Sequence, residues 1–325
     1  MTNANPAAIS LVSSYRQFVA SWRQKIIYLG FIGIFAVFSF VLHGQGFLDP
    51  DNLLNIVRQT AIISIMAVAM TFVLSVGEID LSVGAVAGLV SVITALTMGA
   101  FGVIPGCLAG VASGMLVGTI NGFFTTKIGI PSFLTTLAMM GIARGVAMWV
   151  SVTATIPVLS QSYVYIFGGG NLGRVPILLL WTLLFGFVGH LALWRTGFGR
   201  HVLATGGNEA AARHSGVNTR AVKTTVLIVS STTAAIAGML YAGRLQSGRF
   251  QFGEGDELSV IAAAVLGGTS LFGGVGTVVG SILGTLMIGL INNGLILMGL
   301  EYSQQLIARG AIIILAVSLG QQKRN

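Results

Sequence analysis

Two long intervals of this chain, residues 81–126 and 258–300, contain no Asp, Glu, Lys or Arg. A transmembrane helix needs roughly 20 consecutive apolar residues to cross the bilayer core, so each interval is long enough for two such helices. Only 8% of all residues are charged and 54% are hydrophobic, whereas soluble domains carry about 25% charged residues. With a mean hydropathy of +0.89, the chain is predicted to be an all-α integral membrane protein.

Composition also limits the kinds of site that the chain can hold. The formal net charge is +8, but cationic residues between apolar spans are what membrane insertion requires, so no nucleic-acid partner is expected. Cys107 is the one cysteine, which excludes an intrachain disulfide and a multi-cysteine metal site; it is expected to be a small core residue. Residues 1–325 are predicted to form a single transmembrane domain without a separate soluble catalytic domain.

The hydrophobic pattern predicts about ten membrane spans. They cover residues 26–42, 53–76, two spans in 81–126 split near 102–105, 132–150, 175–194, 224–243, two spans in 258–300 split near 271–274, and 303–319. The first is interpreted as an uncleaved span, because no small-x-small cleavage site follows it. Residues 1–25 suit a short interfacial helix on the cytoplasmic side, with a disordered basic tail as the alternative.

Positive charges distinguish the two faces of this arrangement. With the N-terminus inside, the cytoplasmic face receives Arg16, Arg23, Lys25, Lys127, Arg195, Arg200, Arg213, Arg220, Lys223, Lys323 and Arg324. The outer face receives only Arg174, Arg244 and Arg249. Cytoplasmic loops carry an excess of Lys and Arg, so both termini and the long basic interval 195–223 are predicted to be cytoplasmic.

The two halves of the chain share a pattern. Residues 77–83 (GEIDLSV) are echoed by residues 255–260 (GDELSV), and each stretch leads through two predicted spans to an Asn-Gly pair, at Asn121 and Asn293. The span count puts the first stretch at the inner side and the second at the outer side, which predicts two inverted five-helix repeats, an architecture of transporters. Glycines recur every fourth residue in both halves and are predicted to let helices pack closely. They are Gly102, Gly106, Gly110, Gly114, Gly118 and Gly122, and Gly276, Gly280 and Gly284.

Glu78 and Asp80 are acids within or beside apolar spans. An acid in a span costs about 2.5–3.5 kcal/mol on insertion scales, so such residues usually line a water-filled path or pair with a base. The alternative is a short inner loop in which Asp80 caps the next helix. Arg144 and Arg309 are candidate partners, although an arginine in an apolar helix more often extends its side chain to the interface.

Motifs of catalysis are missing from the sequence. It contains no G-x-x-x-x-G-K-[ST] phosphate-binding loop, no H-E-x-x-H and no G-x-S-x-G on a strand-to-helix turn. The chain is therefore expected not to be an enzyme, and to have no catalytic residues, no metal site and no cofactor of its own.

Four stretches carry a resemblance to a known family: residues 78–84 (EIDLSVG), 206–216 (GGNEAAARHSG), 261–274 (IAAAVLGGTSLFGG) and 292–294 (NNG). The chain resembles the permease subunit of an ATP-binding-cassette (ABC) importer of the ribose and simple-sugar type, in the superfamily shared with branched-chain amino-acid permeases. The resemblance implies a bacterial inner-membrane complex of two permeases, identical or paralogous, surrounded by lipid. It also implies a cytoplasmic ATPase that binds the ATP, and a periplasmic or surface-tethered sugar-binding protein.

The resemblance implies that residues 195–223 form a cytoplasmic coupling loop that docks on the ATPase. Within it, Asn208 is a plausible N-cap, Glu209 to Arg213 a short helix, and Gly216 its C-terminal breaker. The residues assigned to coupling are Gly207, Asn208, Glu209, Ala211, Ala212, Arg213 and Gly216. Three departures stand out. Glu209 lies one place earlier than the acid of similar permeases, and Glu78 is a second acid where they usually carry Gly. Residues 256–259 read Asp-Glu-Leu-Ser where similar permeases usually read Tyr-Glu-Leu-Asp.

The predicted function is import of a monosaccharide, ribose-like or another simple sugar, by alternating access. Polar residues expected in the translocation path are Glu78, Asp80, Ser82, Asn121, Thr269, Asn292 and Asn293. The alternative is an ion-coupled secondary transporter of a small polar solute, with Glu78 and Asp80 as proton or sodium sites. A membrane enzyme is a more distant third.

Overall fold

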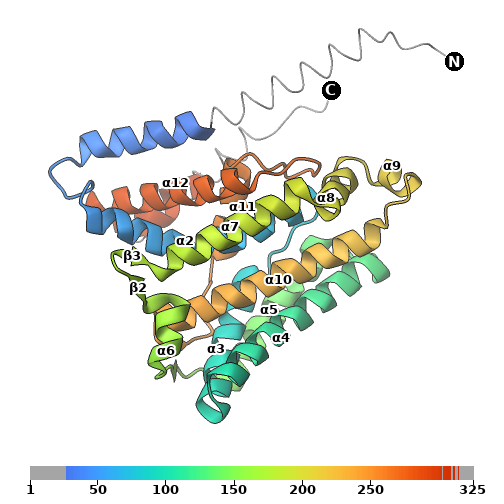
Figure 1. Cartoon of the computed structure of the whole chain (residues 1–325), viewed down its shortest axis with the longest axis horizontal. Coiled ribbons are helices and arrows are strands. Elements are labelled where there is room, and N and C mark those ends of the chain that lie inside the picture. Colours follow the sequence, from blue (N-terminus) through green and yellow to red (C-terminus); the bar gives the residue numbers. More distant parts are fainter. Residues whose placement is uncertain (1–26, 302, 309, 312–313, 315–325) are drawn as a thin grey trace, which may run out of the picture.

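The computed structural model describes residues 27–301, 303–308, 310–311 and 314, and these form an almost entirely helical protein (Figure 1). Residues 1–25, with their predicted interfacial helix, lie outside the described residues, as does much of the predicted last span. The helices long and apolar enough to cross a membrane are α2 (Pro50–Ser75), α3 (Val83–Phe101), α4 (Val103–Phe123, continued by the π-helix η1, Phe124–Ile128), α5 (Ser132–Ser151), α7 (Ile177–Arg195), α10 (Thr219–Arg244) and α12 (Val278–Leu297).

Shorter elements connect them. They are an apolar helix at Ile27–Val41, α6 (Gln161–Val164) with the π-helix η2 (Tyr165–Gly169), α8 (Gly197–Gly207), α9 (Glu209–His214) and α11 (Asp256–Leu266). The described residues also contain two pairs of two-residue antiparallel strands: β1 (Ile156–Pro157) with β4 (Ser247–Gly248), and β2 (Asn171–Leu172) with β3 (Val175–Pro176).

The all-α class is confirmed, and the split of residues 81–126 falls at Gly102 between α3 and α4, as predicted. The interval 258–300 differs, because α11 has only 11 residues and rises about 16 Å at 1.5 Å per residue, too little to cross a bilayer alone. It ends where Gly268 adopts a φ of +89°. Seven described helices reach spanning length, so the count of ten and the repeat stay predictions.

The basic interval 195–223 also differs from the expected loop, because it is mostly helical. Helix α8 was not predicted, since the segment has many glycines and no clear apolar stripe. In the structure Gly199, Val202 and Thr205 are its buried face, spaced three residues apart. Thr196 caps α8 by accepting a hydrogen bond from the Gly199 N–H at 3.2 Å. The seventh span begins at Thr219 rather than near 224, so Lys223 lies inside α10.

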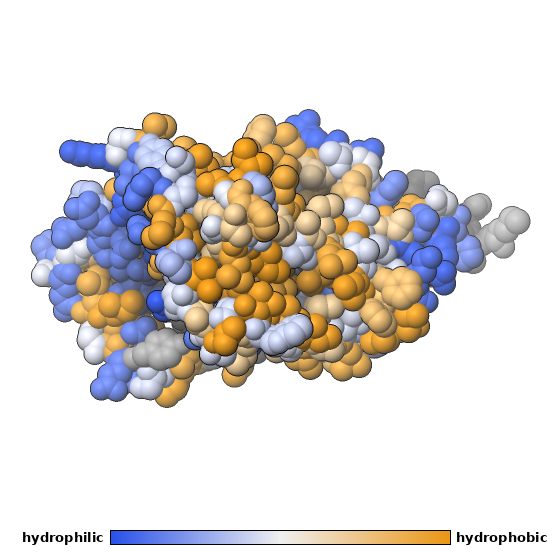
Figure 2. Space-filling view, turned by 90° about the horizontal axis from the view of Figure 1, so that it is seen from below, coloured by the Kyte–Doolittle hydropathy of each residue, from blue (hydrophilic) through white to orange (hydrophobic). Residues whose placement is uncertain are grey.

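The surface agrees with a membrane environment. Figure 2 shows a broad apolar band across the middle of the molecule, with hydrophilic surface at both ends. Large apolar side chains such as Leu108, Leu116 and Phe187 are exposed on α4 and α7, whereas α2, α3 and α10 are mostly buried. An exposed apolar belt of this size is expected where lipid, not water, covers the protein.

Most glycines of the two stripes lie against neighbouring helices, as predicted; Gly102 is an exception, because nothing lies within 4 Å of a Cβ added there. A Cβ atom added at Gly118 of α4 would lie 2.6 Å from the Cα of Ile228 on α10, and one at Gly114 would overlap the Cβ of Ala235. In α12, a Cβ atom at Gly284 would meet the backbone of α11 at Ala263, and one at Gly280 would meet the backbone of Gly267, the residue after α11. Close backbone approach replaces the hydrophobic drive that is missing between helices in lipid.

Replacing Gly114 by Ala is expected to destabilise the α4–α10 contact by about 1–3 kcal/mol, because the added methyl group must displace α10. The matched control is Gly141→Ala on α5, where an added Cβ meets nothing within 4 Å. Thermal unfolding of both variants in detergent measures the difference. Equal midpoints would show that the stripe does not set this contact.

Candidate translocation and coupling site

The connection from α2 to α3, residues 77–82, is held by helix α5. The Ile79 N–H donates to Ser132 Oγ at 3.0 Å, and the Leu81 N–H donates to Thr136 Oγ1 at 3.0 Å. Both acceptors belong to the first turns of α5. Backbone donors of an irregular segment must find partners when they are away from water, so α5 fixes the path of this connection.

Asp80 lies at the centre of a buried polar network. Its Oδ1 accepts hydrogen bonds from the Ser82 N–H at 2.9 Å and the Ser82 hydroxyl at 2.6 Å, and its Oδ2 accepts one from Ser230 Oγ at 2.8 Å. Asn121 Nδ2 donates to Ser82 Oγ at 3.1 Å. All four residues are buried. The structure thus brings together three of the predicted path residues, Asp80, Ser82 and Asn121.

The hydrogen bonds of Asp80 leave its role as a path residue a prediction. The bond from the Ser82 N–H is local, since Ser82 directly precedes α3, but it is not a side-chain cap of that helix. The bond from Ser230 joins the connection to the middle of α10. Ser230 was not singled out from the sequence, although a Ser-Ser pair within an apolar span was the available signal.

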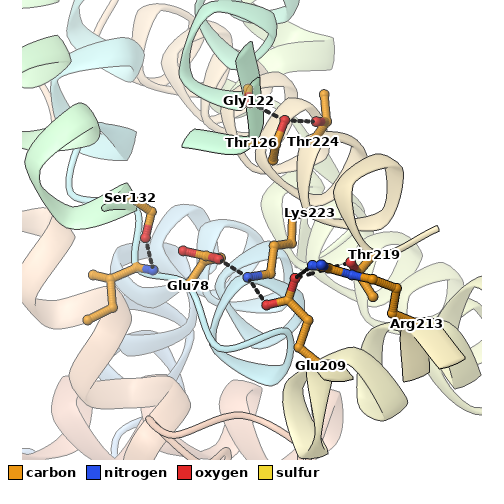
Figure 3. Close-up of polar contacts among 10 residues, drawn as sticks. Glu78, Gly122, Thr126, Ser132, Glu209, Arg213, Thr219, Lys223 and Thr224 are labelled. Atoms are coloured by element: carbon orange, nitrogen blue, oxygen red, sulfur yellow. Dashed lines mark hydrogen bonds and ion pairs between the residues drawn. The ribbon is translucent and has the colours of Figure 1, made fainter. Parts of the chain in front are cut away.

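Glu78 points the other way, toward the basic interval. Its Oε1 lies 2.7 Å from Lys223 Nζ, and the same ammonium lies 2.8 Å from Glu209 Oε2 (Figure 3). The Glu78 and Lys223 side chains are 11% and 18% exposed, against 37% for Glu209. Glu209 Oε1 also accepts from Arg213 at 2.9 Å and from Thr219 at 3.1 Å. Lys223 therefore joins the connection before α3 to helix α9.

The environment of Glu209 keeps its carboxyl ionised. The pKa of Glu209 lies below its ordinary value of 4.5, mainly because of the hydrogen bond from Lys223, with burial acting in the opposite direction. A lowered folded-state pKa contributes stability that is complete above the unfolded-state pKa, and that is lost as the pH falls through the folded-state pKa. The ion pair thus persists throughout the neutral range.

The coupling segment has the predicted local structure. Asn208 Oδ1 accepts from the Ala211 N–H at 3.0 Å and so caps α9, and Gly216 follows the helix with a φ of +84°. Ala212 is buried, while Ala211 and Arg213 are exposed. Helix α8, which precedes α9, packs tightly against the end of α2, since a Cβ atom at Gly206 would overlap the Ser75 carbonyl oxygen.

The other predicted path residues lie elsewhere. Thr269, in the connection between α11 and α12, accepts from the Thr277 N–H at 3.3 Å. Asn293 of α12 exchanges amide hydrogen bonds with Asn52 of α2, at 2.8 and 3.0 Å, and Asn292 is half-buried. Among the described residues, no hydrogen bond joins these three side chains to Asp80.

The expected arginine partners differ as well. Arg144 pairs with Glu254 at 3.1 Å, not with Glu78 or Asp80, and Arg309 lies outside the described residues. Lys223 went unnoticed because it was counted with the basic interval. Its position in the sequence could have indicated a pair with Glu78, because both residues adjoin an apolar span on the predicted inner side.

The family model described as "Branched-chain amino acid transport system / permease component" matches residues 52–317. The chain belongs to this permease family.

Sugar permeases are among its relatives. The permease is 39% identical over 297 residues to the ribose import permease protein RbsC of Bacillus subtilis (strain 168), covering 90% of this chain and 92% of the relative. It is 35% identical over 322 residues to RbsC of Escherichia coli (strain K12), covering 96% and 98%. The xylose transport system permease protein XylH of the same E. coli strain is 33% identical over 350 residues, covering 88% of each chain. No solved structure matches.

Removing the Ser230 hydroxyl should weaken the network. Hydrogen bonds to charged groups contribute about 1.5–3 kcal/mol, so Ser230→Ala is expected to lower the unfolding midpoint of the permease in detergent. The matched control is Ser113→Ala on α4, whose hydroxyl bonds to carbonyls of its own helix. In an Asp80→Ala background the Ser230 substitution should add little; full additivity of the two losses would argue against the bond.

Proposed function

We propose that this permease is the membrane-spanning subunit of an ATP-driven importer of a monosaccharide, ribose-like or another simple sugar. The relatives named for ribose and xylose support the substrate class. The observation that carries the proposal is the chain of ion pairs that links α9, with its exposed residues, to the connection that contains the buried Asp80. A partner pressing on α9 can act on the interior through this tie.

The proposed function requires three partners for the permease. The cytoplasmic ATPase binds and hydrolyses the ATP, so the permease needs no cofactor of its own. The ATPase docks on the exposed residues of α9 and its flanks, around Ala211 and Arg213. A periplasmic or surface-tethered binding protein delivers the sugar on the other side. A second permease, a copy or a paralogue, completes the complex in the bacterial inner membrane.

Alternating access requires two halves that move against each other. We assign ten spans in two inverted repeats, with both termini in the cytoplasm. The glycine contacts of α4 with α10 and of α12 with α11 support a comparable packing role in the two halves. Each half of the chain then contains an irregular segment between helices: residues 77–82 in the first half, and the connection that contains Thr269 in the second.

Sugar hydroxyls need polar groups that replace water along the path. In the first half Asp80, Ser82 and Asn121 supply a carboxylate, a hydroxyl and an amide within one network. The Asn121 Oδ1 atom is buried without a hydrogen-bond partner among the described residues, so it has free accepting capacity for a hydroxyl. In the second half Thr269 supplies a hydroxyl and Asn292 and Asn293 supply amides, without a carboxylate.

Proteoliposomes that contain the permease and its ATPase test the function. With ATP and the sugar-loaded binding protein, radiolabelled ribose, arabinose or xylose should accumulate against a gradient. Uptake should need ATP and be unaffected by dissipating the proton and sodium gradients. Transport by the permease alone on an ion gradient would instead establish the secondary transporter, with buried Asp80 as its ion site.

A bulky residue on α9 tests the docking surface in the same preparation. Ala211→Trp should prevent the ATPase from co-purifying with the permease and abolish uptake, because Ala211 is exposed on the helix assigned to docking. Ala100→Trp is the matched control, since Ala100 is exposed near the turn between α3 and α4, away from α9 (Figure 1). Loss of the ATPase from both variants, or from neither, would refute the assignment.

A further inference from the structure

Lys223 is shared by carboxylates from two separate parts of the chain. Glu78 belongs to the connection between α2 and α3, and Glu209 opens helix α9. The two ion-pair distances, 2.7 and 2.8 Å, are nearly equal. Lys223 itself lies in the second turn of α10, so a single ammonium group holds three elements together (Figure 3).

The two carboxylates depend on Lys223 to different degrees. Glu209 keeps Arg213 and Thr219 as further donors. Among the described residues, the ion pair with Lys223 is the only one that Glu78 makes. Glu78 is also the less exposed of the two acids. Removing one partner of a largely buried pair leaves an uncompensated charge, so the position of Glu78 is set by where Lys223 stands.

A movement of Glu78 would also move buried residues, because its neighbours in the chain are hydrogen-bonded to α5, to α10 and to the start of α3. The neighbouring Ile79 N–H is bound to Ser132 of α5. Two residues after Glu78, Asp80 is bound to Ser230 of α10 and to Ser82 at the start of α3. The ion pair and this network lie in one irregular segment, 77–82, without a regular helix between them.

We propose that Lys223 is the positioning residue that transmits movement of α9 to residues 77–82, and that Glu78 belongs to this transmission rather than to the sugar path. The inference rests on the proposed function, because it needs a partner that moves α9. Lys223 then acts as a shared counter-ion: when the ATPase displaces Glu209, the ammonium follows it and draws Glu78 along. Asp80 and its network move with the same segment.

The experiment compares ATPase stimulation in nanodiscs that hold the complete complex. The readout is the ratio of the ATPase rate with sugar-loaded binding protein to the basal rate. Lys223→Met and Glu78→Gln are each expected to lower this ratio about tenfold, within the range of coupling changes that single residues produce. Lys223→Arg keeps the positive charge and should retain most of the stimulation. Lys127→Met, on the exposed end of η1, is the matched control and should behave like the wild type.

The double variant Glu78→Gln/Lys223→Met separates transmission from folding. It leaves no unpaired buried charge at this place, so its unfolding midpoint should recover while its stimulation ratio stays low. Recovery of the ratio together with stability would overturn the proposal, and so would undiminished stimulation in Glu78→Gln. Failure of the wild-type permease to bind any ATPase would instead contradict the proposed function.

Discussion

A charge removed from water in a membrane protein must have a counter-ion, and here one ammonium group serves two acids. Lys223 neutralises Glu78, which is otherwise without an ion-pair partner among the described residues, and it also contacts Glu209 on the surface helix α9. Desolvation makes such pairs costly to separate. The geometry of the connection between α2 and α3 therefore depends on the position of α10 and, through Glu209, on that of α9.

Close helix packing around this site depends on glycines, which have no side chain. The glycines of α4 admit the backbone of α10 at a distance that any Cβ would forbid. This brings Asn121 of α4 and Ser230 of α10 into the same network around Asp80. Buried polar networks rigidify a structure when they are fully satisfied, whereas here the Asn121 Oδ1 atom has no hydrogen-bond partner among the described residues. The glycine contacts and the hydrogen bonds thus tie α3, α4 and α10 to the connection 77–82, which contributes Asp80 and Ser82 to the network.

Sequence reasoning reached the helical class, the positions of most long helices and the cap, helix and breaker of the segment from Asn208 to Gly216. These follow from local patterns: charge-free length, capping residues and glycine conformation. Of the seven residues that it assigned to the translocation path, the structure joins Asp80, Ser82 and Asn121 in one network, and the path itself stays a prediction. It missed Lys223 and α8, and it expected two full spans where α11 is short. Those features depend on which side chains meet in space and on glycine contacts between helices, and neither is visible in a local pattern.

If Lys223 couples these elements, α9 and the connection before α3 move as one. In a Cys107→Ser background, spin labels at His214→Cys, the last residue of α9, and at Phe133→Cys on α5 report their separation in labelled complexes that retain the ATPase, since α5 holds that connection and both positions are exposed. With Lys223 intact, the distance between the two labels should be the same in the nucleotide-free and the ATP-trapped complex, and with Lys223→Met it should differ between these two states. A distance that shifts with nucleotide while Lys223 is intact would contradict this coupling.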